Sequence, residues 1–302
     1  GFSDTSFSNP TLVSTFYPSN TTTVPMNRMS YSSDGSNLAL GYLAQVNVPQ
    51  GNVELWTSSN YLDGTAYTED SSSDITISAD ALKALLDTNV NVTLQANTDI
   101  IINAPISTTG TGTLSLHAGR DVDINKSIST SGNLAIIASD MSANNVVSAQ
   151  RDSGTGDVLA AYESDETTSI SLTASDLDIT LNNGSGVTNA SMGNIELATI
   201  TATTGTLQSA NFSGSGAAVS DKAHDGTTSA TVATTGSVSG LTLVGSDLAL
   251  VNTAAFTSAT IGAAKDATVD YDLSGYLSST MDVTDTSSTA ITESVTASIT
   301  PS

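Results

Sequence analysis

A repeated stretch from Asn89 to Asp140 constrains what this chain can fold into more than any other feature. When the stretch is shifted by 22 residues it aligns with itself. The matched positions are Leu94 with Leu116, Ala96 with Ala118, Asp99 with Asp121, Ile102 with Ile124, Asn103 with Asn125, the Ile-Ser-Thr runs at 106–108 and 128–130, and Gly110 with Gly132. A fixed period in the twenties indicates a solenoid, because one such repeat can bury its apolar face only against the next repeat.

Each repeat divides into three short strands that are separated by polar or Gly/Pro corners. In the first repeat we expect strands at 92–95, 100–102 and 106–108. Three strands and three corners close one coil of a parallel β-helix, and successive coils stack about 4.8 Å apart. At one corner Asn103 and Asn125 are expected to form an amide ladder. The sequence therefore predicts an all-β fold, a right-handed parallel β-helix with about 20–22 residues per coil.

One short helix is expected at 78–87, just before the first repeat. Leu82, Leu85 and Leu86 lie on one face of this helix, and Asp80 can cap its start. Because a helix of about two turns is not stable alone in water, its leucine face is expected to pack on an adjoining coil.

Three regions follow from how the sequence pattern changes along the chain. Residues 1–70 are non-repetitive and form an N-terminal cap or an assembly segment. Residues 71–265 form the parallel β-helix, with a loop or lateral excursion at about 141–168, where the period is lost. Residues 266–302 read as strands that cap the second end or pair with a partner. Gly214–Ala217 and Asp221–Gly226 are expected as loops within the second region.

The first region differs from the rest of the chain in composition. It holds nine of the fourteen aromatic residues and four of the six prolines. It either covers the open end of the β-helix or forms an extended arm that inserts into a neighbouring subunit. The residues expected to make such an assembly contact are Phe2, Phe7, Leu12, Val13, Phe16 and Tyr17.

The segment 75–140 resembles the filamentous-haemagglutinin-like exoproteins of two-partner secretion, which are bacterial β-helix proteins. The sequences that carry the resemblance are ADALKALLDTNVNVTLQANTDIIINAPI, HAGRDVDINKSI and GNLAIIA. The resemblance implies the β-helix fold, but it implies no particular activity, because fold and function separate freely. The chain is shorter than typical members and lacks their secretion-domain signature, so we expect either a fragment or a small separate subunit.

Charge and composition exclude several classes of partner. Thirty acidic and seven basic residues give a formal net charge of −23, which disfavours nucleic acid and anionic membrane surfaces. The chain has no cysteine and no apolar run of about 18 residues that would span a membrane as a helix. A cysteine-free, acidic, Ser/Thr-rich chain that begins at Gly1 is typical of a secreted or cell-surface bacterial protein. Its expected partners are other copies of itself and host or environmental glycans.

No catalytic residues are predicted, and the expectation is that the protein is not an enzyme. Asn97-Thr98-Asp99 is similar to a polygalacturonase motif, but the other motifs of that family are missing, and Asp99 recurs as Asp121. His117 and His224 have no partner spaced for a metal site. The Thr-rich runs 199–206 and 227–235 shift register too much for an ice-binding array.

Calcium is the one ion that the acidic loops favour, because they supply hard oxygen ligands. The candidate ligands are Asp152, Asp157, Glu163, Asp165 and Glu166. Solvated acidic loops are the simpler interpretation and the favoured one. No cofactor is therefore predicted, and calcium is kept as the one alternative.

The sequence thus predicts a secreted structural or adhesive β-helix protein, a subunit of an extracellular filament or surface layer. Assembly is expected by end-to-end strand pairing, because each end of a solenoid exposes unpaired strands. The alternative is a glycan-binding or glycan-degrading β-helix protein of the bacterial exterior.

Overall fold

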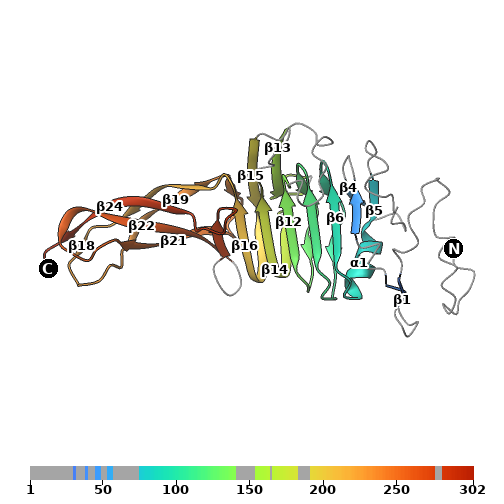
Figure 1. Cartoon of the computed structure of the whole chain (residues 1–302), viewed down its shortest axis with the longest axis horizontal. Coiled ribbons are helices and arrows are strands. Elements are labelled where there is room, and N and C mark those ends of the chain that lie inside the picture. Colours follow the sequence, from blue (N-terminus) through green and yellow to red (C-terminus); the bar gives the residue numbers. More distant parts are fainter. Residues whose placement is uncertain are drawn as a thin grey trace, which may run out of the picture.

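The computed structural model describes residues 75–140, 154–163, 165–182, 191–275 and 281–302, and the backbone of four short strands nearer the N-terminus. These strands are β1 (Ser30–Tyr31), β2 (Leu38–Ala39), β3 (Gln45–Val48) and β4 (Val53–Trp56). The fold is mostly β, with large and mostly parallel sheets and one helix in the described part. The molecule is elongated: short parallel strands stack side by side and continue into a narrow region of long strands (Figure 1).

One sheet has seven strands, and every neighbouring pair in it is parallel. In spatial order the strands are β20 (Leu241–Leu243), β15 (Ser191–Leu197), β13 (Thr155–Ala160), β10 (Val122–Ile124), β7 (Ile100–Ile102), β4 and β5 (Ile75–Ser78).

The second sheet has thirteen strands, and its first half is parallel as well. The parallel strands are β3, β6 (Val92–Ala96), β9 (Leu114–Ala118), β12 (Leu134–Ala138), β14 (Ser171–Leu181) and β16 (Thr199–Ser209), with β8 (Ile106–Ser107) and β11 (Ile128–Ser129) branching from β14. We call the parallel strands of residues 75–209, together with β3 and β4, the stack. The prediction of a β-rich chain with parallel strands is confirmed.

Strand pairing confirms the 22-residue repeat and also shows where it shortens. Leu94 lies opposite Leu116, and Ile106 lies opposite Ile128, both 22 residues apart. The next pair, Leu114 and Leu134, is only 20 residues apart. Gly132 therefore lies against Gly112, and the predicted match of Gly132 with Gly110 is wrong. The corner before β12 is two residues shorter than the corner before β9. A sequence alignment with a constant offset of 22 residues does not reveal this shortening.

The core of the stack consists of apolar rows that run from strand to strand. Alternation along each strand places every second side chain on the inner face. One row passes through five adjacent strands, and all of its side chains are completely buried: Leu94, Leu116, Ile136, Ile179 and Leu207. Because equivalent positions lie on top of one another, a single apolar choice per repeat builds a continuous core.

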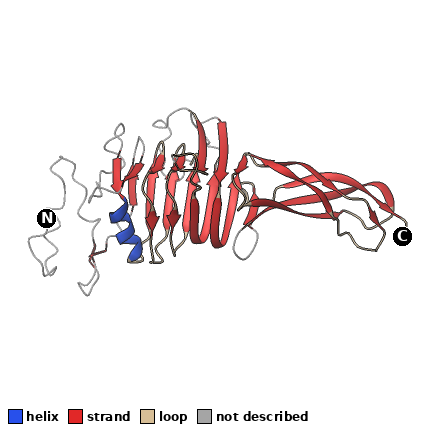
Figure 2. Ribbon diagram, turned by 180° about the vertical axis from the view of Figure 1, so that it is seen from behind, coloured by secondary structure: helices blue, strands red, loops and turns tan. Residues whose placement is uncertain are grey.

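The helix α1 (Ala79–Asp87) lies at the end of the stack opposite the long strands (Figure 2). Leu82, Leu85 and Leu86 are buried, so the predicted leucine face is confirmed. Its cap differs from the prediction. Ser78 is the N-cap residue and accepts a hydrogen bond from the backbone N–H of Ala81 at 3.4 Å, whereas Asp80 lies in the first turn. A carboxylate there still interacts favourably with the helix dipole.

Polar side chains at two corners bind the neighbouring turn of chain. The predicted amide ladder is present, since Asn125 Nδ2 donates to Asn103 Oδ1 at 3.0 Å. At another corner three side-chain oxygens each accept a backbone N–H from the residue 22 positions later, in the pairs Asp87–Thr109, Asn89–Thr111 and Asn91–Thr113, at 2.7, 2.8 and 2.9 Å.

Beyond the stack, strand pairing becomes mostly antiparallel in residues 213–275 and 281–302, which we call the arm. Its strands are β17 (Ser213–Val219), β18 (Lys222–Ala223), β19 (Val232–Ser239), β20, β21 (Ala249–Phe256), β22 (Gly262–Ser274), β23 (Met281–Thr284) and β24 (Thr292–Thr300). Two of these strands return to the stack: β23 pairs in parallel with β16, and β20 pairs in parallel with β15. The arm therefore continues both sheets of the stack.

These boundaries differ from the regions expected from the sequence. The expected boundary at 265/266 lies inside β22, and antiparallel pairing begins at β17. Gly214–Ala217, expected as a loop, belongs to β17, where Gly216 has φ +80°. Within the expected excursion at 141–168, residues 155–160 form β13, a central strand of the seven-stranded sheet. Strands that pair across long separations leave no period in the sequence.

Replacing Gly132 by Ala tests the close stacking of the shortened corner. A Cβ atom at position 132 would overlap the backbone carbonyl oxygen of Gly112. We expect Gly132→Ala to lower the free energy of unfolding by about 2 kcal/mol, measured by urea denaturation. In the control Gly262→Ala the added atom meets only the flexible side chain of Lys265, at 3.0 Å. Equal stability of the two variants would contradict the stacking.

Candidate functional site

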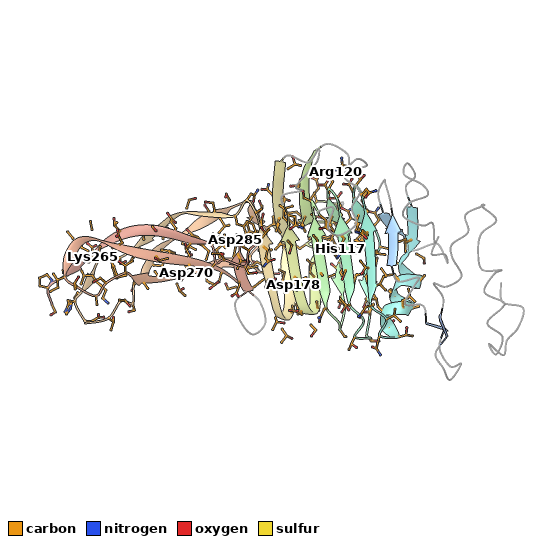
Figure 3. The ribbon with its side chains drawn as sticks, in the orientation of Figure 1. His117, Arg120, Asp178, Lys265, Asp270 and Asp285 are labelled. Carbon is orange, nitrogen blue, oxygen red and sulfur yellow. The ribbon has the colours of Figure 1, made fainter. Side chains whose placement is uncertain are left out.

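The main concentration of perturbed titratable groups lies at one corner of the seven-stranded sheet. We call it the acidic corner, and its residues are Asp99, Arg120, Asp121, Asp123 and Asp157. The repeat puts Asp99 and Asp121 immediately before β7 and β10, and the pairing of β10 with β13 brings Asp157 alongside. Figure 3 shows Arg120 near one edge of the stack, among these strands.

Three of these carboxylates form a ladder along the stack. Asp99 Oδ1 accepts the backbone N–H of Asp121 at 3.0 Å. Asp121 Oδ1 accepts that of Asp157 at 2.8 Å. Asp157 Oδ1 in turn accepts that of Asn194 at 2.5 Å. Each carboxylate thus binds an amide that a corner would otherwise leave without a strand partner. The repetition of Asp99 and Asp121 along the sequence therefore corresponds to a structural role.

Arg120 lies between two carboxylates of the ladder. Its guanidinium forms an ion pair with Asp99, donating from Nε to Oδ1 at 2.7 Å and from a second nitrogen to Oδ2. Arg120 Nε also lies 3.3 Å from Asp121 Oδ2. One cation therefore faces four carboxyl groups at this corner.

The crowding of carboxyl groups changes their acidity. Burial, with the negative charge of Asp99 second, raises the pKa of Asp121 to about 7. Burial, followed by the charges of Asp99 and Asp157, raises the pKa of Asp123 to about 6. The attraction of Arg120 lowers both values but does not outweigh these causes.

Asp123 differs from the other three carboxylates. Its Oδ1 is buried and has no hydrogen-bond partner within the described residues. Strand pairing puts Asp123 between Ile101 on β7 and Leu159 on β13, so its row offers no side-chain donor. Leu159, which is paired with Asp123, is 36% exposed, so apolar surface lies beside this carboxyl group.

A second buried carboxylate lies on the other sheet. Asp140 is completely buried, and its Oδ2 is 3.0 Å from His117 Nδ1. Asn182 donates from Nδ2 to Asp140 Oδ1 at 3.2 Å. His117 occupies the position of Gln95 in the neighbouring strand, as expected. Its pairing with Asp140 was not predicted, because no repeat of the pair exists in the sequence.

Four of the five candidate calcium ligands lie among the described residues. Asp157 belongs to the ladder, and Glu163 forms an ion pair with Lys126. The hydroxyl of Thr168, which donates to Asp165 Oδ2 at 2.6 Å, and then the backbone N–H groups of Thr168 and Thr167 lower the pKa of Asp165. Glu166 lies in the same turn with φ +55°, and Asp152 lies outside the described residues. Among described residues no group of three or more His, Cys, Asp or Glu side chains could hold a metal ion.

The six residues expected to make the assembly contact cannot be placed. Phe2, Phe7, Leu12, Val13, Phe16 and Tyr17 all lie outside the described residues. Their role stays a prediction.

In the arm, Glu293 joins strands that are not neighbours in a sheet. Its carboxylate on β24 accepts the backbone N–H groups of Gly216 and Ala217 on β17, at 3.0 and 2.9 Å. It also accepts the hydroxyl of Tyr271 on β22 at 2.6 Å. Burial and then the bond to Glu293 raise the pKa of Tyr271. This node holds β17 beside β24, although the two strands are not paired in a sheet.

No family model, curated protein or solved structure matches the chain. In the part of the chain that the structure describes, no helix is long and apolar enough to cross a membrane.

Removing Asp99 tests whether the ladder stabilises the stack. Asp99→Ala leaves the N–H of Asp121 and the guanidinium of Arg120 without their main acceptor. We expect a loss of about 3 kcal/mol in the free energy of unfolding, measured by urea denaturation. Asp99→Asn keeps an acceptor oxygen and should lose less. If Asp99→Ala is as stable as the wild type, the ladder has no stabilising role.

Tyr271 tests the node in the arm. Tyr271→Phe removes one hydrogen bond to Glu293 and should lower the free energy of unfolding by about 1 kcal/mol. Gly214→Ala should lower it further, because its Cβ would overlap the ring of Tyr271. Tyr162→Phe, at an exposed tyrosine, is the matched control and should leave thermal unfolding unchanged. A control that loses as much as Tyr271→Phe would refute the role of the node.

Proposed function

We propose that the protein is a secreted structural or adhesive component of the bacterial exterior, in which a right-handed parallel β-helix carries the arm. The observation that supports it most is the ladder from Asp99 to Asn194. The acidic groups that recur in the repeat bind backbone amides of the next strand, so they hold neighbouring strands together along the long axis of the molecule. A rod of this kind suits a subunit of an extracellular filament or surface layer.

Unpaired strand edges support assembly of copies end to end. Among the described strands, β5 pairs only with β4 and β3 pairs only with β6 at one end of the stack. At the other end β20 pairs only with β15. An exposed strand edge presents unpaired N–H and C=O groups to another chain. At this second end β23 already occupies the edge of β16, so a neighbouring copy would meet the arm there as well.

A second candidate function is glycan binding or glycan cleavage, and the acidic corner favours it. Burial raises the pKa of Asp121 to about 7, and a general acid for glycoside cleavage also has a raised pKa. Tyr162 and Leu159 supply exposed aromatic and apolar surface, of the kind on which a sugar ring packs. Calorimetric titration of neutral and anionic polysaccharides into the wild type and Asp121→Asn would detect such a site.

The filament hypothesis predicts polymers of the whole chain that need the N-terminal segment. We expect the full chain to form filaments in negative-stain electron microscopy and fast-sedimenting species in analytical ultracentrifugation. Deletion of residues 1–30 should leave soluble monomers with unchanged circular dichroism and unfolding temperature. Polymers of the truncated chain would overturn the role of this segment, and monomers of the full chain at all concentrations would overturn the filament.

A further inference from the structure

We propose that the acidic corner is a pH-sensitive element that strengthens the stack of parallel strands as the pH falls from about 8 to about 5. This property is independent of whether the protein forms filaments or binds glycans. Its basis is an arrangement of carboxyl groups that strand pairing imposes on the chain.

The geometry sets like charges against each other. Strand pairing places Asp99, Asp121 and Asp157 side by side, and each accepts a backbone N–H from the following strand, that of Asp121, Asp157 and Asn194 respectively. They cannot turn away from one another without breaking the ladder. Like charges directly opposite each other on neighbouring strands are destabilising.

Neighbouring groups offset the negative charge of these carboxylates only in part. Arg120 is the one cation that contacts these carboxylates among the described residues. The buried Oδ1 of Asp123 has no donor within the described part of the chain, and an ionised oxygen in that position carries a desolvation cost that protonation removes. β9, which is packed against β10, carries His117, and His117 contacts Asp140. Glu196 lies beside Leu159 on β15, one strand further along.

The sign of the pH effect follows from proton binding. Asp121 and Asp123 have pKa values raised to about 7 and about 6, so the folded chain holds protons that the unfolded chain has already released. Their favourable contribution is fully present below the pKa of an unfolded aspartate, and it is lost as the pH rises through 6 and 7. Asp87, Asp165, Asp225 and Glu293 have lowered pKa values, so the stability they contribute is lost only below about pH 4.

The experiment measures the unfolding temperature of the full chain at about pH 5, 6, 7 and 8. We expect the wild type to unfold roughly 3–6 °C higher at pH 5 than at pH 8. The double variant Asp121→Asn/Asp123→Asn should lose most of this difference and should unfold at a higher temperature than the wild type at pH 8. Asparagine at position 121 keeps an acceptor for the N–H of Asp157, so the ladder remains.

Asp178→Asn is the matched control. Asp178 is an aspartate of the same stack on the other sheet, where it accepts the hydroxyl of Thr206 at 2.6 Å (Figure 3). This control should keep the wild-type pH dependence. Asp272, whose burial raises its pKa, is unchanged in every variant, so its contribution cancels in the comparison.

A second measurement counts protons directly. Potentiometric titration of folded and urea-unfolded protein should show that the folded wild type binds about one more proton than the unfolded chain between pH 5 and 7, and that Asp123→Asn alone reduces this excess. A wild-type unfolding temperature that stays constant or falls on acidification would overturn the proposal. So would a double variant that keeps the full wild-type pH dependence.

Discussion

Parallel strand pairing at a nearly constant sequence spacing is the constraint on which the rest of this structure depends. Each strand of the stack binds the strand before it and the strand after it, so equivalent residues must lie one above another. Apolar residues gain from this arrangement, and the row from Leu94 to Leu207 is completely buried. For charged residues the same arrangement places like charges side by side. The same pairing that builds the core also forces Asp99, Asp121 and Asp157 into one line.

Features that repeat could be predicted from the sequence, and features that depend on distant partners could not. The strands of the first two repeats, the leucine face of α1 and the Asn103–Asn125 ladder were predicted because each depends on local pattern or on the 22-residue spacing. The ladder of aspartates was recognised only as a repeated position. Its third member, Asp157, lies beyond the period and joins through the pairing of β10 with β13. Asp140 was missed for the same reason.

The arm shows why long-range pairing escapes a reading of periodicity. β17 and β19 consist mostly of exposed and half-buried residues, and glycines interrupt both strands, so their sequence resembles loops. Packing requires glycine at two of these positions, because a side chain at Gly214 or Gly236 would overlap Tyr271. The tyrosine, in turn, reaches Glu293 on β24. Residues from strands far apart in the sequence thus pack around the buried ring of Tyr271. No single segment of the sequence is enough to predict this contact.

In the acidic corner, the carboxyl groups that hold neighbouring strands together are also the ones available for proton or ligand binding. Asp99, Asp121 and Asp157 each use one oxygen to bind the backbone of the next strand, so any ligand for these groups competes with the stack itself. The buried Oδ1 of Asp123 accepts no hydrogen bond from the described residues, and Asp123 lies between Ile101 and the exposed Leu159. Its protonation would remove a charge from between two apolar neighbours. The surface near β10 therefore changes character with pH for the same reason that the stack does, because the repeat leaves these carboxyl groups no room to separate.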